Sequence, residues 1–238
     1  MSVRLSRLRR ATEARLTAAL AAYGFERRAE MDATGLSFSL GSEIRNTTQI
    51  LTAYILDDEN SSVATTATIA LHSSGVAQII GALPIGARIS PILLPPDLLG
   101  DGEVDFPSNV DGAGDSFFQP GLYISSENDI DRYIEWFSRT VESDVIPWFA
   151  ARNNIEVLVT NVMTPERYSW FEKNINPGKV RATVALCLVN EEWELAAQIM
   201  KWYLRKPRGF NSVDSIVKAG HFDKAMRTMF ADYSALRN

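Results

Sequence analysis

The chain has 238 residues, of which 46% are hydrophobic and 22% are charged, and its formal net charge is −5. This composition is typical of a globular protein with a buried core, and no apolar run approaches the ~18 residues that a membrane-spanning helix needs. The single cysteine, Cys187, cannot form an internal disulfide and lies in the apolar run VALCLV, which favours a reducing compartment and a buried structural thiol.

The N-terminal segment is rich in arginine and has the spacing of an amphipathic helix. Apolar and small residues recur every three or four positions from Leu5 to Tyr23, and Gly24 follows as a helix stop. The arginines are compatible with an organellar transit peptide, but the helical spacing favours a folded helix. A secretory signal is disfavoured because no small-residue cleavage site follows the short apolar run. The expected location is the cytoplasm.

The next part of the chain predicts an antiparallel meander of β-strands. Short segments rich in β-branched and aromatic residues are joined by connections too short for parallel crossovers. In one of them Val63, Thr65, Ala67 and Ile69 share one face, while Thr66 and Thr68 share the other. The segments are FERRAE, GLSFSLG, NTTQILTAYILDD and SSVATTATIALHSS, with GVAQIIGAL as a short helix after the fourth. Further along, SFFQPGLYISS predicts another strand, or two strands broken at Gln119-Pro120-Gly121.

An aromatic-rich helix is predicted over residues 127–150. Ser126, with Asp129 three residues later, has the pattern of a capping box. The apolar residues then recur at helical spacing, so the aromatic side chains favour core packing over a ligand-binding cluster, with only Trp136 at the edge of the stripe. Pro147 should kink or end the helix near its last turn.

The C-terminal third predicts paired helices. One pair breaks at Asn190 and a second at Gly220, and an offset of 29 residues aligns Trp193 with Phe222. This pattern is similar to that of tetratricopeptide-type hairpins. The predicted fold is therefore α+β, with an antiparallel sheet of about four to six strands covered by the N-terminal helix and the central helix. We expect an α+β domain over residues 1–150 and a helical-hairpin appendage over residues 151–238 packed on it.

Charge is distributed very unevenly along the chain. Residues 1–28 carry a net charge of +5, residues 29–145 carry −14 and residues 146–238 carry +4, which sum to −5. An acidic middle disfavours nucleic-acid binding, which needs clustered lysine and arginine. It favours a basic protein partner or a cation instead.

The strongest candidate site in the sequence is an acidic segment rich in proline and glycine, residues 84–116. A long segment of this composition is either functional or a solvated loop. Three acids alternate as calcium ligands can, but Phe106 replaces the glycine of an EF-hand and Gly112 replaces its glutamate. The candidate partner-binding residues are Asp101, Glu103, Asp105, Asp111 and Asp115.

Catalytic signatures are sparse. His72 and His221 form no metal-binding pair of the HxxxH or HExxH type, and the sequence contains no GxSxG elbow, P-loop or GxGxxG motif. No cofactor and no metal are therefore expected, and no catalytic residue is assigned. Asp and Glu residues brought together only by the fold remain an alternative, which would make the protein a hydrolase or transferase.

Some of these features resemble a bacterial domain-of-unknown-function family, number 4304. The basic first helix ending in YGFERR, the β-meander and the helix DIDRYIEWFSRTVESDVIPWF carry the resemblance, over roughly residues 5–172. The family has no established enzymatic activity and is similar in appearance to small immunity proteins of bacterial toxin systems. The resemblance implies a non-enzymatic, immunity-like binding protein with an acidic interaction surface.

Overall fold

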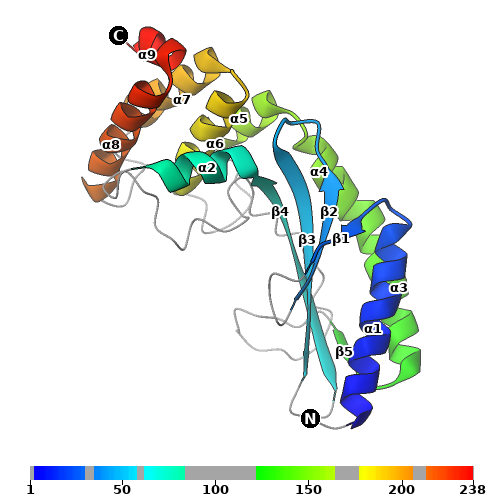
Figure 1. Cartoon of the computed structure of the whole chain (residues 1–238). Coiled ribbons are helices and arrows are strands. Elements are labelled where there is room, and N and C mark those ends of the chain that lie inside the picture. The colour runs from blue at the N-terminus through cyan, green and yellow to red at the C-terminus, as the bar shows by residue number, and fades with distance from the viewer. Residues whose placement is uncertain are drawn as a thin grey trace. The chain divides into compact units, whose positions relative to one another are not determined.

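A computed structural model describes residues 3–29, 35–57, 62–83, 122–163, 177–205 and 213–237. The fold is α+β, with one antiparallel sheet and helices at both ends of the chain (Figure 1). The chain divides into two compact units. The first takes the described residues within Met1–Gly41, Gln49–Ala70 and Asp101–Ala150, and the second takes those within Ser42–Thr48, Leu71–Gly100 and Ala151–Asn238.

The sheet has five strands in sequential order, which confirms the predicted antiparallel meander. The edge strands are fixed by pairing Glu26 with Ser39 on one side and Val63 with Ile124 on the other. The short connections among the first four strands account for their order, because a parallel crossover needs many more residues. Residues 74–121 separate the fourth strand from the fifth, so connection length does not fix the place of the fifth strand. The strands are β1 (Glu26–Arg27), β2 (Gly35–Gly41), β3 (Thr47–Asp57), β4 (Val63–Ser73) and β5 (Leu122–Ile124).

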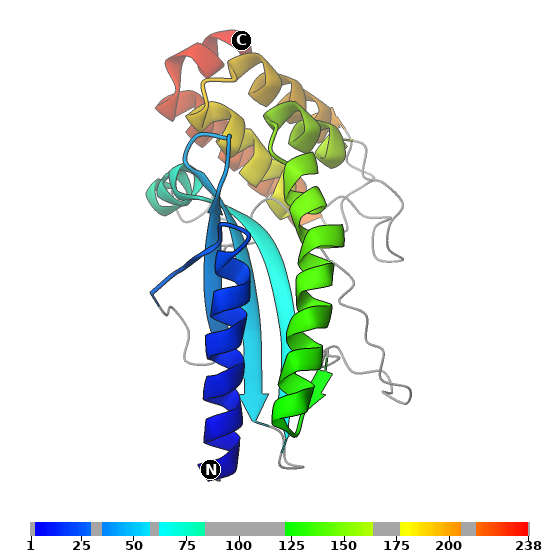
Figure 2. The same cartoon turned by 90° about the vertical axis from the view of Figure 1, so that its right-hand side faces the viewer.

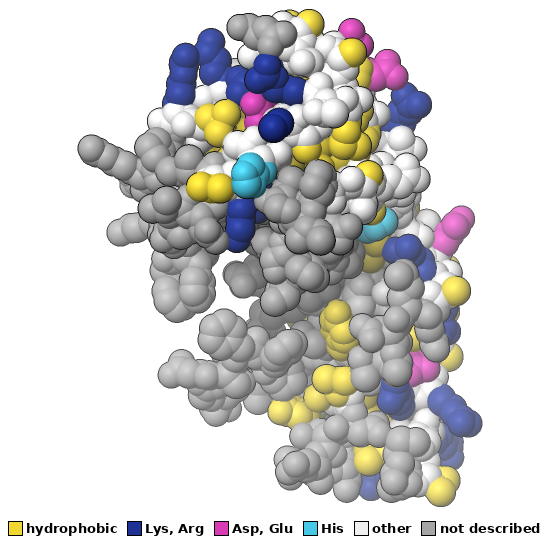
Figure 3. Space-filling model, turned by 60° about the vertical axis from the view of Figure 1, so that its left-hand side comes forward, with side chains coloured by type: hydrophobic (Ala, Val, Ile, Leu, Met, Phe, Trp, Pro, Cys, Tyr) yellow, Lys and Arg dark blue, Asp and Glu magenta, His cyan; other side chains and the backbone are white. Residues whose placement is uncertain are grey.

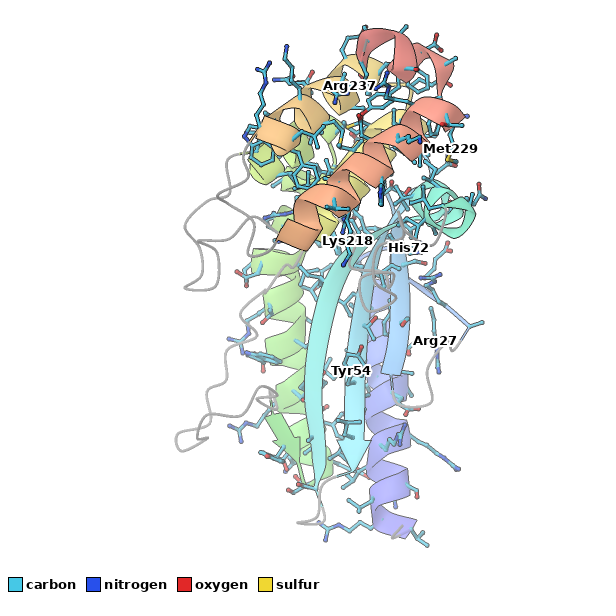
Figure 4. All side chains as sticks on the ribbon, turned by 90° about the vertical axis from the view of Figure 1, so that its left-hand side faces the viewer. Arg27, Tyr54, His72, Lys218, Met229 and Arg237 are labelled. Atoms are coloured by element: carbon cyan, nitrogen blue, oxygen red, sulfur yellow. The ribbon has the colours of Figure 1, made fainter. Side chains whose placement is uncertain are left out.

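One face of the sheet forms the core of the first unit. On β4, Val63, Thr65 and Ile69 are buried on the predicted face, because alternate side chains of a strand point the same way. On β3 the same alternation buries Leu51 and Ile55. Tyr54 lies between them in sequence and points to the face turned away from the helices (Figure 4).

Helix α1 (Val3–Ala21) covers the buried face of the sheet. Its inward stripe repeats every three or four residues, and Leu16 and Leu20 at its C-terminal end are almost completely buried. The helix ends as the sequence predicts, since Gly24 adopts a φ of +82°, a conformation that residues with a Cβ atom rarely adopt. Phe25 then donates its backbone N–H to the Leu20 carbonyl and enters the core.

Helix α3 (Glu127–Thr140) lies beside α1 over the same face of the sheet (Figure 2). Its N-terminus is the predicted capping box: Ser126 Oγ accepts the Asp129 N–H at 3.3 Å, and Asp129 Oδ2 accepts the Ser125 N–H at 3.1 Å. Ile130, Tyr133 and Phe137 are buried. The aromatic residues of this helix therefore serve mainly as core.

The helix continues past α3 as a π-helical turn, η3 (Val141–Val145), and then as α4 (Ile146–Ala151). The helix runs four residues beyond Pro147 and ends at Ala151. The ring of a proline clashes with the carbonyl four residues earlier and provides no N–H to it, and here that carbonyl belongs to Ser143. A wider π-turn just before the proline accommodates the ring, because its hydrogen bonds span five residues instead of four.

The second unit is a bundle of helices around α6. Residues 180–188 of α6 are all buried, which is expected of a helix enclosed on every side, and α6 contacts α2, α5, α7 and α8. Gly75 of α2 sits close to the Val189 side chain, where a Cβ atom would come within 3.2 Å of it. The helices are α2 (Ser74–Ala82), α5 (Ile155–Met163), α6 (Pro177–Val189), α7 (Trp193–Arg205), α8 (Val213–Met229) and α9 (Ala231–Arg237).

The predicted helix breaks are half right. A turn at Asn190 and Glu191 separates α6 from α7, and Glu191 takes a φ of +67° there. The break predicted at Gly220 is wrong, because α8 runs through it and ends at Met229. A single exposed glycine costs a helix only ~1 kcal/mol, which packing of the buried face of α8 outweighs. Trp193 therefore begins a helix while Phe222 lies within one, and the 29-residue repeat does not hold.

Candidate functional site

The predicted acidic site lies outside the described residues. This applies to Asp101, Glu103, Asp105, Asp111 and Asp115 alike. The described residues nevertheless show where acidic side chains pair with arginines.

The basic helix α1 and the acidic helix α3 neutralise each other along their contact. Arg7 pairs with Glu127 at 2.8 Å, and Arg15 pairs with Asp131, which lies one turn further along α3. Beyond α1, the Tyr23 hydroxyl donates to Glu142 of η3 at 2.8 Å, and this hydrogen bond raises the pKa of Tyr23. Residues more than 110 positions apart in sequence thus form one seam of opposite charges.

The net charges on the two sides of the seam are equal and opposite. Helix α1 has five arginines and one glutamate, a net charge of +4, and residues 127–145 have six acidic and two arginine residues, a net charge of −4. Residues 84–121 have six acidic residues and Arg88, a net charge of −5, so the rest of the chain sums to zero. That zero is the sum of −4 over residues 22–83 and +4 over residues 146–238, so the segment that the sequence singles out carries a net charge equal to that of the whole chain.

The two histidines do not form a common site. His72 lies in β4 and His221 in α8, and the histidine side chains reach the surface at two separate places (Figure 3). Among the residues placed by the structure, no three His, Cys, Asp or Glu side chains converge so that they could hold a metal ion.

Cys187 lies on the enclosed helix α6 and is fully buried. Burial raises the pKa of its thiol from 9.0 to about 12, and the nearby charge of Glu192 acts in the same direction. Because the thiolate is the reactive form of cysteine, this thiol is suited to packing rather than to chemistry.

We expect this raised pKa to make the fold lose stability in alkali. The folded thiol keeps its proton while the unfolded thiol releases it above pH ~9, so the stabilisation is complete below pH 9 and falls as the pH rises towards 12, by about 1.4 kcal/mol per pH unit. Urea unfolding of the wild type and of Cys187→Ala between pH 8 and 11 measures it. The pH profile of the variant should be flatter by this slope, and parallel profiles would contradict the assignment.

A buried ionic cluster joins the last two helices. The Tyr233 hydroxyl donates to Asp223 Oδ1 at 2.5 Å, while Arg237 donates from Nε to Oδ1 at 3.1 Å and from Nη2 to Oδ2 at 3.3 Å. Burial, followed by the hydrogen bond to Asp223, raises the pKa of Tyr233. Arg237 lies on α9 at the C-terminal end of the chain (Figure 4). This arrangement ties α9 to α8, and both oxygens of the carboxylate accept hydrogen bonds within it.

A second buried cation has no such partner. Arg181 of α6 is only 4% exposed, and its Nε and Nη1 atoms are buried without a hydrogen-bond partner. Burial lowers the pKa of its guanidinium, and the nearby Tyr203 acts against this. No salt bridge among the described residues involves Arg181.

Neither buried cluster was anticipated from the sequence. Arg181 carries a usable signal, since it is the one charge in the otherwise uncharged run VRATVALCLV. Asp223 and Arg237 are 14 residues apart on different helices and have no comparable signal, because each reads as part of an ordinary solvated face.

The chain matches no protein-family model, no curated protein and no solved structure. The resemblance to family 4304 therefore stays a prediction. No helix within the described ranges is both long and apolar enough to cross a membrane.

Proposed function

We propose that the protein is a non-enzymatic binding module of the immunity type, which recognises a basic protein partner through an acidic surface. The observation that supports this proposal is the charge balance between α1 and the α3–η3 helix, +4 against −4. Since these charges face each other, their fields largely cancel at a distance. Residues 84–121 carry a net charge of −5, and a charge of this size attracts a basic partner at long range.

The individual seam pairs contribute little to stability. Arg7 and Glu127 are both more than half exposed, and exposed ion pairs contribute about 0–1 kcal/mol. Their effect on recognition is larger than their effect on folding, because they remove the α3 acids from the set of charges available to a basic partner. This makes the α3 acids a matched control for the acidic segment.

The alternative, a hydrolase or transferase with fold-assembled carboxylates, stays a prediction that no observation favours. In the described part of the chain, Asp223 is the one acidic side chain that is buried, and both of its oxygens accept hydrogen bonds from Arg237 or Tyr233. A carboxylate held in this way stabilises the fold rather than transferring protons to a substrate.

Neutralising the acidic segment is expected to slow association with the partner. A variant with Asp101, Glu103, Asp105, Asp111 and Asp115 replaced by Asn or Gln keeps the side-chain shapes but removes five charges. A partner recovered by pull-down should associate more slowly with it at 0.05 M salt, and the two rates should converge near 1 M, where the screening length falls to ~3 Å. Stopped-flow or surface-based kinetics over a salt series measures this.

The control is a variant with Glu127, Asp131 and Glu135 replaced by Gln or Asn. It also removes negative charge but only from side chains that already pair with arginines, so a specific acidic site predicts a much smaller change in association rate. If both variants slow association equally per charge, the partner responds to net charge alone. If neither does, the acidic segment takes no part in recognition.

A further inference from the structure

The first turn of α6 and the buried side chain of Arg181 have chemistry that the proposed binding function does not use. Apart from Arg181, residues 180–188 are apolar, small or carry a hydroxyl, and all of them are buried. An arginine in this environment is unusual, because charged side chains are almost never fully buried unless they are paired.

An unpaired buried guanidinium is costly. Moving an ion out of water costs several kcal/mol even after the protein relaxes, and arginine cannot escape this cost by losing its proton. Lysine or histidine could become neutral in such a place, whereas Arg181 stays charged with Nε and Nη1 unpartnered. The chain therefore maintains a buried positive charge that nothing among the placed side chains compensates.

The position of Arg181 on the helix adds to this positive charge. It is the fifth residue of α6, which starts at Pro177 and is 13 residues long. Long side chains on a helix lean back by about one turn towards its N-terminus. A guanidinium that leans in this way lies near the first turn, where backbone N–H groups point outward and the helix dipole is positive. Tyr203 of α7 lies close enough to interact electrostatically with it.

We propose that Arg181 and the N-terminal turn of α6 bind a small oxyanion, a carboxylate or a phosphate, inside the helical unit. The fork of N–H groups on a guanidinium matches two oxygens of either anion, and a helix N-terminus supplies further donors to the same group. An anion bound there satisfies the two orphaned nitrogen atoms and compensates the buried charge. This site is separate from the proposed protein-binding function and does not depend on it.

The test compares anions at constant ionic strength. Wild-type protein is heated in chloride, acetate and phosphate, and the melting temperature should rise by about 3–5 °C once acetate or phosphate exceeds its dissociation constant about tenfold. Arg181→Met should show no rise. In chloride alone it should be as stable as the wild type or more stable, since replacing an unpaired buried charge by an apolar side chain of similar size removes the desolvation cost.

Two further variants complete the test. Arg205→Met removes an exposed arginine at the end of α7 and should respond to phosphate as the wild type does. Arg181→Lys retains the charge but loses the fork and should respond more weakly, which keeps the test valid if Arg181→Met does not fold. The proposal is overturned by a wild type that ignores both anions, by equal responses in Arg181→Lys and the wild type, or by an Arg181→Met variant less stable in chloride. The last result would mean that a carboxylate of the chain already pairs with Arg181.

Discussion

Replacing Asp223 by alanine is expected to lower the free energy of unfolding of the helical unit by roughly 3–5 kcal/mol. The carboxylate is only 7% exposed and accepts hydrogen bonds from both Tyr233 and Arg237. Its removal leaves a largely buried guanidinium and a fully buried phenol without their partner. Removing one partner of a buried ion pair is costly because the remaining charge then has neither water nor a partner to stabilise it.

Companion variants separate the charge from the hydrogen bonds. Tyr233→Phe removes one neutral donor and should cost only about 1 kcal/mol. Asp223→Asn keeps the acceptor but loses the charge, so its loss should lie between the two. Urea unfolding followed by far-UV circular dichroism measures all three.

A double variant tests whether Asp223 and Arg237 act as a pair. Asp223→Ala combined with Arg237→Met should be less destabilised than the sum of the single changes, since no unpaired charge remains. Additive losses would show that the two residues stabilise α9 independently, and a loss below 1 kcal/mol for Asp223→Ala would show that water replaces the carboxylate.

The first unit of the fold could be predicted from sequence because its determinants are local. Gly24 ends α1 through its own backbone freedom, and Ser126 with Asp129 starts α3 through hydrogen bonds within four residues. The first four strands follow from alternation and from connections too short for parallel crossovers. In each case the interaction that decides the structure lies within the window that the pattern covers.

The errors arise where packing overrides a local preference. Gly220 weakens a helix by about 1 kcal/mol, and neighbours such as Phe222 and Met226, both fully buried, stabilise α8 by more than that. Pro147 lies in the last helical segment, which ends at Ala151, but the π-helical turn over Val141–Val145 before it does not follow from the local pattern. Neither outcome is visible in the window around the residue itself.

The order of charges along the chain does not show which of them pair in the folded protein. The sequence shows a basic start and an acidic middle, but the pairing of Arg7 with Glu127 spans 120 residues. From the sequence alone, the acidic residues of α3 are therefore all expected to be available to a partner. The described residues also show a contrast between two buried charges. Asp223 accepts hydrogen bonds from two side chains, whereas Nε and Nη1 of Arg181 have no hydrogen-bond partner.

The remaining large effect is expected in the core of the first unit, where Phe137→Ala should lower the free energy of unfolding by roughly 3–5 kcal/mol. Phe137 is 1% exposed, and its ring lies 5.6 Å from that of Tyr133, centroid to centroid. Truncation removes the buried ring and leaves a cavity between α3 and the sheet, which the packed neighbours can fill only in part.

The neighbouring residue provides the control. Trp136 is larger than Phe137 and lies beside it on α3, but it is only partly buried, so Trp136→Ala should cost clearly less, about 1 kcal/mol. Both changes introduce alanine at adjacent positions of one helix, and the difference in helix propensity therefore nearly cancels. Denaturant unfolding of both variants decides whether the aromatic residues of this helix are core or a binding surface. A larger loss for Trp136→Ala would place the important packing on the outer edge of α3 and contradict the arrangement described.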